Sequence, residues 1–150
     1  MAETLGMLCD KLTIVKLKEY HTQDSARLES LRGQAIELQQ EIDEYVSAAL
    51  AGDIPAGRLT FASNKVYKKE GNDVPDVTGK IGEVFYRLAD ANCRLWHEQE
   101  KVYEFEQVPA EEKDKVVKLL ALLNLERNKC IDSINSQFSR LITADKAENK

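Results

Sequence analysis

Apolar residues recur along this chain at alternating steps of three and four, the spacing that places them on one face of an α-helix. The pattern is clearest between Ser25 and Leu50. We expect a helix there, because Asp24 or Ser25 can cap its first free amides and Gly52 can adopt the left-handed geometry of a helix end. The apolar face consists of Leu28, Leu31, Ala35, Leu38, Ile42, Tyr45 and Ala49.

Three further segments show the same periodicity. The first carries Leu5, Leu8, Leu12 and Val15. The next covers about 77–107 and follows Pro75, and the last begins at Pro109 and ends near Ile142. The last two helices are long enough to form an antiparallel hairpin. The sequence therefore predicts an all-α, four-helix bundle-like fold with coiled-coil-like seams, in which the last two helices form a long antiparallel hairpin.

The domain organisation follows from the breaks in this pattern. Residues 1–142 are expected to form a single helical-bundle domain, and the polar tail 143–150 is expected to fray. Residues 51–75 form a long connecting loop that contains glycine, proline and several basic residues. We favour a solvated crossover for this loop over a lid that contacts an anion.

Composition and charge exclude several classes of protein. The 150 residues include 26 acidic and 21 basic side chains, which gives a net charge of -5. Non-specific binding to nucleic acid is disfavoured by this charge, and no apolar stretch is long enough for membrane insertion. Cys9, Cys93 and Cys130 are widely separated and lie in helical patterns, so we interpret them as reduced core residues of a cytoplasmic protein.

Polar residues interrupt the apolar seams, and they are the candidate site. A buried polar group without a partner costs free energy, so these residues are expected to meet each other or to line a wet pocket. An interhelical hydrogen-bond network is favoured over a ligand-binding pocket lined by the same residues. These seam residues are Asp10, His21, Asn92, Gln99, Asn124, Arg127, Asn128 and Asn135.

Two patterns suggest catalysis or metal binding, but both are weak. Cys93 and His97 share a helix face, yet the sequence marks no third group to orient them. Glu41 and Glu44, followed by Glu70 and Asp73, imitate the acid pairs of a metal-dependent nucleotide pyrophosphatase. The second pair lies in a loop with glycine and asparagine, where no helix orients both carboxylates on one metal ion. We therefore expect no metal ion, no cofactor and no catalytic residue.

The polar seams also carry a family resemblance. Three short motifs resemble those of an uncharacterised family of small bacterial all-helical proteins. They are Asp10-Lys11-Leu12-Thr13-Ile14, Leu95-Trp96-His97-Glu98 and Arg127-Asn128. The same resemblance includes Leu17-Lys18, His21, Asn92, Asn124, Ile131 and Ile134-Asn135. Genes of that family often lie near those for surface-polysaccharide synthesis, so the resemblance implies an accessory role in that pathway. It implies no catalytic residues, but it groups six residues into one expected site or network: Asp10, Lys11, Asn92, Trp96, Arg127 and Asn128.

The expected function is therefore that of a non-catalytic interaction or assembly protein. The length of the last two helices suggests that the bundle pairs with itself, as a homo-oligomer, or with another protein. The alternative is a small-molecule binding protein, in which Arg127, Lys11 and Asn92 hold an anionic ligand such as a nucleotide or phosphosugar. Metal-dependent nucleotide hydrolysis is a minor alternative.

Overall fold

The computed structural model describes residues 3–61 and 76–148, and the chain is all-α in these residues. The described part contains four α-helices and no strand, which confirms the expected fold class. The α-helices are α1 (Leu5–His21), α2 (Ser25–Ala51), α3 (Ile81–Tyr103) and α4 (Ala110–Glu148), and the short 3-10 turns are η1 (Ala56–Arg58) and η2 (Phe105–Gln107).

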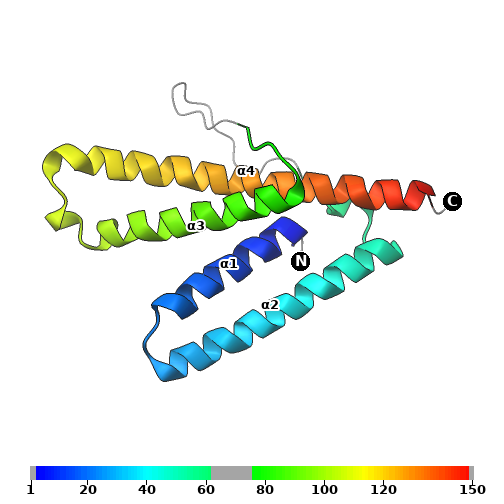
Figure 1. Cartoon of the computed structure of the whole chain (residues 1–150), viewed down its shortest axis with the longest axis horizontal. Helices are drawn as coiled ribbons and strands as arrows, with labels where there is room; N and C mark the ends of the chain where they lie inside the picture. The colour runs from blue at the N-terminus through cyan, green and yellow to red at the C-terminus, as the bar shows by residue number, and fades with distance from the viewer. Residues whose placement is uncertain (1–2, 62–75, 149–150) are drawn as a thin grey trace.

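The helices form two hairpins (Figure 1). α1 turns directly into α2, and α3 joins α4 through η2 to make the long antiparallel hairpin that the sequence predicted. α4 has 39 residues and is about 58 Å long at ~1.5 Å per residue. It runs the whole length of the molecule, with α3 along one part of it and the start of α1 beside another part.

Side chains cap the N-termini of α1 and α2, and a glycine ends α2. The Thr4 and Asp24 side chains accept hydrogen bonds from the first turns of α1 and α2, at 3.4 Å from Met7 N and 2.9 Å from Arg27 N. Gly52 ends α2 with a φ of 82°, in the left-handed region that favours glycine. The expected bounds of α2 are confirmed.

Three other helix boundaries were wrong. α3 begins at Ile81 rather than near residue 77, because Gly79 has a φ of 111° and interrupts any helix that starts before it. After Tyr103 the chain leaves the α-helix and forms η2, so α3 also ends before residue 107. α4 continues through Glu148, six residues past its expected end, because the polar segment contains alanine, lysine and glutamate, which favour helix, and no glycine or proline.

The apolar core lies where the start of α1, the end of α2, the start of α3 and the second half of α4 meet. Each leucine, isoleucine, valine or phenylalanine of this core contributes about 1.5–3 kcal/mol when it is fully buried. The cluster comprises Leu5, Cys9, Ala49, Leu59, Val84, Leu88, Cys130, Ile131, Ile134, Phe138 and Ile142. Leu59, 1% exposed, directly follows η1 and is the part of the 51–75 connection that joins this core. The 62–75 part of that expected loop lies outside the described residues.

Burial along α1 falls toward its C-terminal end, and this positions the candidate site. Leu5 and Cys9 belong to the core, whereas Ile14 and Leu17 are only half-buried. A cleft therefore opens between the second half of α1 and the helices α3 and α4.

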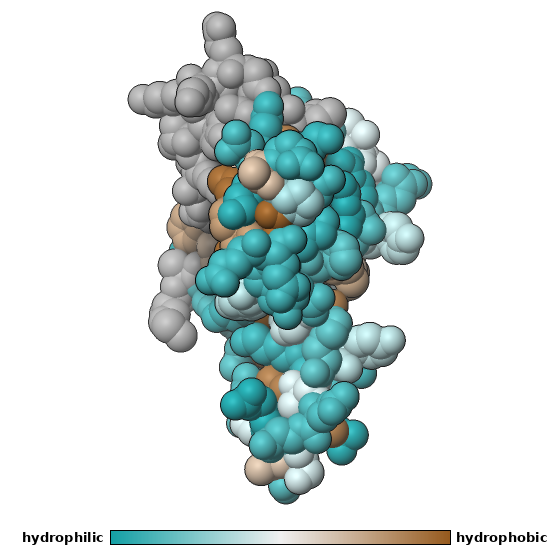
Figure 2. Space-filling view, turned by 90° about the vertical axis from the view of Figure 1, so that its left-hand side faces the viewer, coloured by the Kyte–Doolittle hydropathy of each residue, from teal (hydrophilic) through white to brown (hydrophobic). Residues whose placement is uncertain are grey.

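The surface is mainly polar at the end of the molecule where both hairpins turn, with small separate apolar patches (Figure 2). Among the described helices, none is both long enough and apolar enough to cross a bilayer.

α1 packs so closely on α4 at Gly6 that no larger residue fits there without a shift of the backbone or its neighbours. A Cβ atom there would lie 2.5 Å from the carbonyl oxygen of Ile131 and 2.8 Å from Oδ1 of Asn135. Gly6→Ala should therefore lower the free energy of unfolding by about 1–3 kcal/mol in urea titrations.

Gly33 provides the matched control for this substitution. Nothing lies within 4 Å of a Cβ atom at Gly33, in the exposed middle of α2. Gly33→Ala should raise the free energy of unfolding by about 0.5–1 kcal/mol, since alanine favours helix over glycine. Equal effects of the two substitutions would contradict the close α1–α4 packing.

Candidate functional site

Asp10 is the centre of the polar residues that the sequence singled out. It is 6% exposed and lies on the face of α1 that turns toward α3 and α4. The Nδ2 atom of Asn92, on α3, donates to Oδ1 of Asp10 at 2.9 Å and lies 2.7 Å from Oγ1 of Thr13. A buried carboxylate requires such donors. The expected interhelical network therefore exists between α1 and α3.

Arg127 joins this network from α4. Its Nε atom lies 3.3 Å from Oδ1 of Asp10, which makes an ion pair between α1 and α4. The buried Nε–H makes no hydrogen bond within the described residues, so at this distance the N–H is poorly aligned with the carboxylate oxygen. The attraction is therefore Coulombic, and the guanidinium is not locked by a bidentate pair. The Arg127 side chain is 30% exposed, which weakens the attraction further.

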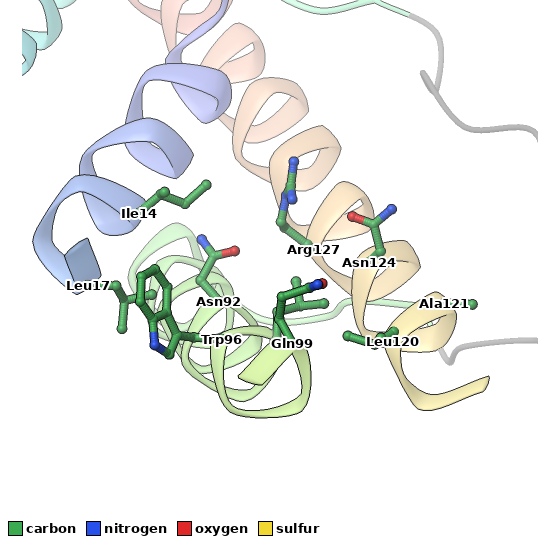
Figure 3. Close-up of a pocket in the computed structure, with 10 residues that line it drawn as sticks. Ile14, Leu17, Asn92, Trp96, Gln99, Leu120, Ala121, Asn124 and Arg127 are labelled. Atoms are coloured by element: carbon green, nitrogen blue, oxygen red, sulfur yellow. The ribbon is translucent and has the colours of Figure 1, made fainter. Parts of the chain in front are cut away.

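An open cleft of about 520 Å³ lies beside this network, between α1, α3 and α4 (Figure 3). Asn92 and Arg127 connect the network to the cleft, because they belong to both. The ten lining residues are mainly apolar and amide side chains, and Arg127 is the only charged one among the lining residues that the structure describes. They are Ile14, Leu17, Asn92, Leu95, Trp96, Gln99, Leu120, Ala121, Asn124 and Arg127.

Trp96 and His21 form an aromatic pair at the edge of the cleft. Their rings stack with centroids 4.7 Å apart and an interplanar angle of 19°. Trp96 Nε1 donates to Oε1 of Glu100 at 2.9 Å, and Nδ1 of His21 lies 2.8 Å from the carbonyl oxygen of Leu17. These contacts fix the orientation of the indole ring, and Trp96 also lines the cleft.

Three residues of the predicted set lie apart from the cleft. Lys11 is exposed and pairs with Glu3 in a groove between α1 and α2. The Nδ2 atom of Asn128 donates to the carbonyl oxygen of Asn124 within α4, at 2.8 Å. Asn135 accepts a 2.7 Å hydrogen bond from the Gly6 amide, so it holds the start of α1 against α4.

The structure adds Thr13 to the network and places the predicted seam residues Gln99 and Asn124 at the cleft. The Thr13 hydroxyl lies against the Asn92 amide and also donates to the carbonyl oxygen of Asp10, at 2.8 Å. Its position three residues after Asp10, on the same helix face, was the available signal. Gln99 and Asn124 interrupt the seams of α3 and α4 and contribute free amides to the cleft.

The cysteines divide into two classes. Cys9 and Cys130 are buried, and burial raises the pKa of each thiol to about 11. A raised pKa keeps a thiol protonated and poorly reactive. Cys93 is exposed, so its assignment to the core was wrong. No described hydrogen bond joins Cys93 to His97.

The candidate metal ligands do not assemble in the described part of the chain. Glu41 and Glu44 are exposed on α2, and Glu70 and Asp73 lie outside the described residues. Within 3–61 and 76–148, no three histidine, cysteine, aspartate or glutamate side chains come together in a way that could hold a metal ion.

Comparison of the chain with protein-family models, curated proteins and solved structures found no match. The resemblance to a bacterial helical family, with the accessory role that it implies, therefore stays an expectation.

The network predicts a large effect of Asn92→Ala. This substitution removes the amide donor to Asp10 and leaves a buried carboxylate with weaker compensation. The free energy of unfolding should fall by about 2–3 kcal/mol, measured by urea denaturation.

Gln99→Ala is the matched control, because Gln99 lines the same cleft on the same helix but is exposed and has no contact with Asp10. It should change the free energy of unfolding by less than about 0.5 kcal/mol. Similar losses for both variants would show that the Asp10 network does not stabilise the fold.

Proposed function

We propose that this protein binds a small molecule in the cleft between α1, α3 and α4. The observation that carries the proposal is the lining itself, which combines one guanidinium, three amides and an oriented indole with aliphatic side chains. Ligand sites typically have volumes of about 300–1,000 Å³ and few polar groups on a mainly apolar wall. The cleft, at about 520 Å³, fits this description.

The arrangement of Arg127 supports binding at this position. Its one described ion pair is poorly aligned, so the guanidinium can present donors to a ligand without first breaking a bidentate pair. The Asp10 network and the Trp96–His21 stack position the polar groups before binding, which reduces the entropy lost on association. We also propose a cytoplasmic location, which the three free cysteines support.

Helix length gives less support to assembly than the sequence suggested. Buried residues occur along α4 from Val116 to Ile142, where it packs on α3 and then on α1. Packing within the chain therefore uses most of the length of α4.

Ligand-induced stabilisation tests the proposal directly. We expect at least one compound from a panel of sugars, sugar phosphates, nucleosides and nucleotides to raise the Tm. At ~100 times its Kd a ligand adds about 2.7 kcal/mol to stability, or about 5–10 °C for a chain of this size.

Two variants locate the binding to the cleft. Ala121→Trp fills the cleft without touching Asp10 and should abolish the shift, whereas Lys11→Ala, in a different groove, should retain it. A panel without any effect, or a shift that survives Ala121→Trp, would refute binding in the cleft.

Self-association is a second candidate, and one surface favours it. Two adjoining grooves along α1 share Thr13 and Lys16, and both are mainly apolar. Ile36, 66% exposed, and Phe85, 38% exposed, line one groove, and Tyr20, 84% exposed, lines the other. Exposed apolar side chains that gather in neighbouring grooves are characteristic of interfaces, and a second copy of this chain is the occupant we propose.

Light scattering with size-exclusion chromatography measures this association. We expect a dimer at micromolar concentration and a monomer for Ile36→Glu, because the introduced carboxylate would be buried at the interface. Leu50→Glu is the matched control on the same helix, since Leu50 is 52% exposed and lines neither groove. A wild-type monomer under these conditions would contradict self-association.

A further inference from the structure

The charge of the cleft restricts what it can bind. Arg127 is the only charged residue among the described residues of the lining, and its positive charge lies 3.3 Å from the carboxylate of Asp10. For a ligand in the cleft, the nearby carboxylate offsets part of the attraction that Arg127 alone would exert on an anion. The chain as a whole carries -5, which opposes the approach of a polyanion.

Phosphate sites are built differently. A phosphate group carries up to two negative charges and is usually held by several cations, a glycine-rich loop or a helix N-terminus. Lys11, the second cation that the sequence suggested for an anionic ligand, pairs with Glu3 in the α1–α2 groove and does not reach this cleft. The polar residues at the cleft come from the middle of their helices, where backbone amides are already bonded.

The remaining polar groups suit a ligand that both donates and accepts hydrogen bonds. Asn92 uses its Nδ2 atom within the network, and its Oδ1 atom lies on the side that faces α4 (Figure 3). The side-chain amides of Gln99 and Asn124 each supply a donor and an acceptor, and Arg127 supplies donors. A hydroxyl group matches such a set because it can serve in either role.

The apolar part of the lining completes the match. Trp96 and Leu120 lie at opposite sides of the cleft and present hydrocarbon surface between the amides (Figure 3). A molecule with hydroxyl groups at its edge and C–H groups on its face can satisfy both kinds of surface at once.

We propose that the ligand is an uncharged, hydroxyl-rich molecule such as a free sugar or polyol, rather than a phosphate-bearing one. This inference rests on the proposed function, because it specifies the ligand class of the same cleft. Asp10 then has a positioning role: it neutralises Arg127 and so sets the selectivity of the cleft against anions.

Matched pairs of probes test the ligand class by calorimetric titration. Glucose, N-acetylglucosamine and adenosine are compared with glucose 6-phosphate, N-acetylglucosamine 6-phosphate and AMP. We expect at least one of the two neutral sugars to bind at least about tenfold more tightly than its phosphate. Its Kd should change less than about twofold between low salt and about 0.5 M salt, because no net charge is screened.

Two substitutions weaken the selectivity against the sugar phosphate if the inference is correct. Asp10→Asn removes the charge that compensates Arg127, so the Kd of the sugar phosphate should fall by about fivefold or more. Gln99→Lys adds a cation at an exposed position of the lining and should act in the same direction, which keeps the test available if Asp10→Asn does not fold. Stabilities of both variants are measured by urea denaturation in parallel.

The outcomes separate the two proposals. Binding of a phosphate probe that exceeds binding of its neutral partner, and that is lost in Ala121→Trp, would overturn the inference and leave the cleft as a binding site. Absence of binding by every probe, together with no thermal shift in the wider panel, would refute the proposed function and the inference with it.

Discussion

A carboxylate is buried at the point where three helices converge, and the arrangement around it depends on how that charge is compensated. Asp10 lies on α1, Asn92 reaches it from α3 and Arg127 from α4. Each partner fixes one helix relative to α1, because an uncompensated buried charge is costly. Replacing all three groups with apolar residues would preserve burial but would remove the requirement that these particular helix turns meet. Register, rather than net stability, is what such a network contributes.

The same constraint leaves the cleft open. α1 is held tightly against α4 at its start, where Gly6 allows close approach and Asn135 binds its amide. Farther along α1, Ile14 and Leu17 are only half-buried and line the cleft. The side chains that face them across the cleft include amides and a guanidinium. These polar groups are poorly suited to a dry core, so the second half of α1 separates from the α3–α4 hairpin beside them. Core and cleft are therefore consecutive parts of one packing arrangement.

The sequence could predict the helices and three members of the network, Asp10, Asn92 and Arg127, because both follow from periodicity and from the cost of burying polar groups. α2, with Asp24 and Gly52 at its ends, was predicted to within a residue. The late start of α3 was missed because glycines near a helix start can lie inside or outside it, and only tertiary packing decides which. Lys11 was wrongly grouped with Arg127, since a residue adjacent to Asp10 along α1 points about 100° away from it. Thr13 was missed for the converse reason, as it shares the face of Asp10.

Compensation of Arg127 by Asp10 also underlies the ligand class that we propose for the cleft. Read as a sequence, an arginine among asparagines suggests an anion site. In the fold, the carboxylate that completes the network lies behind the same guanidinium, so the charge that would attract an anion is already balanced. The donors of Arg127 remain usable, because hydrogen-bonding capacity and net charge are separate properties of the group. A buried acid placed for helix register thereby determines the polarity of the adjacent cleft, and it links the packing of α1 to the kind of molecule that the cleft can hold.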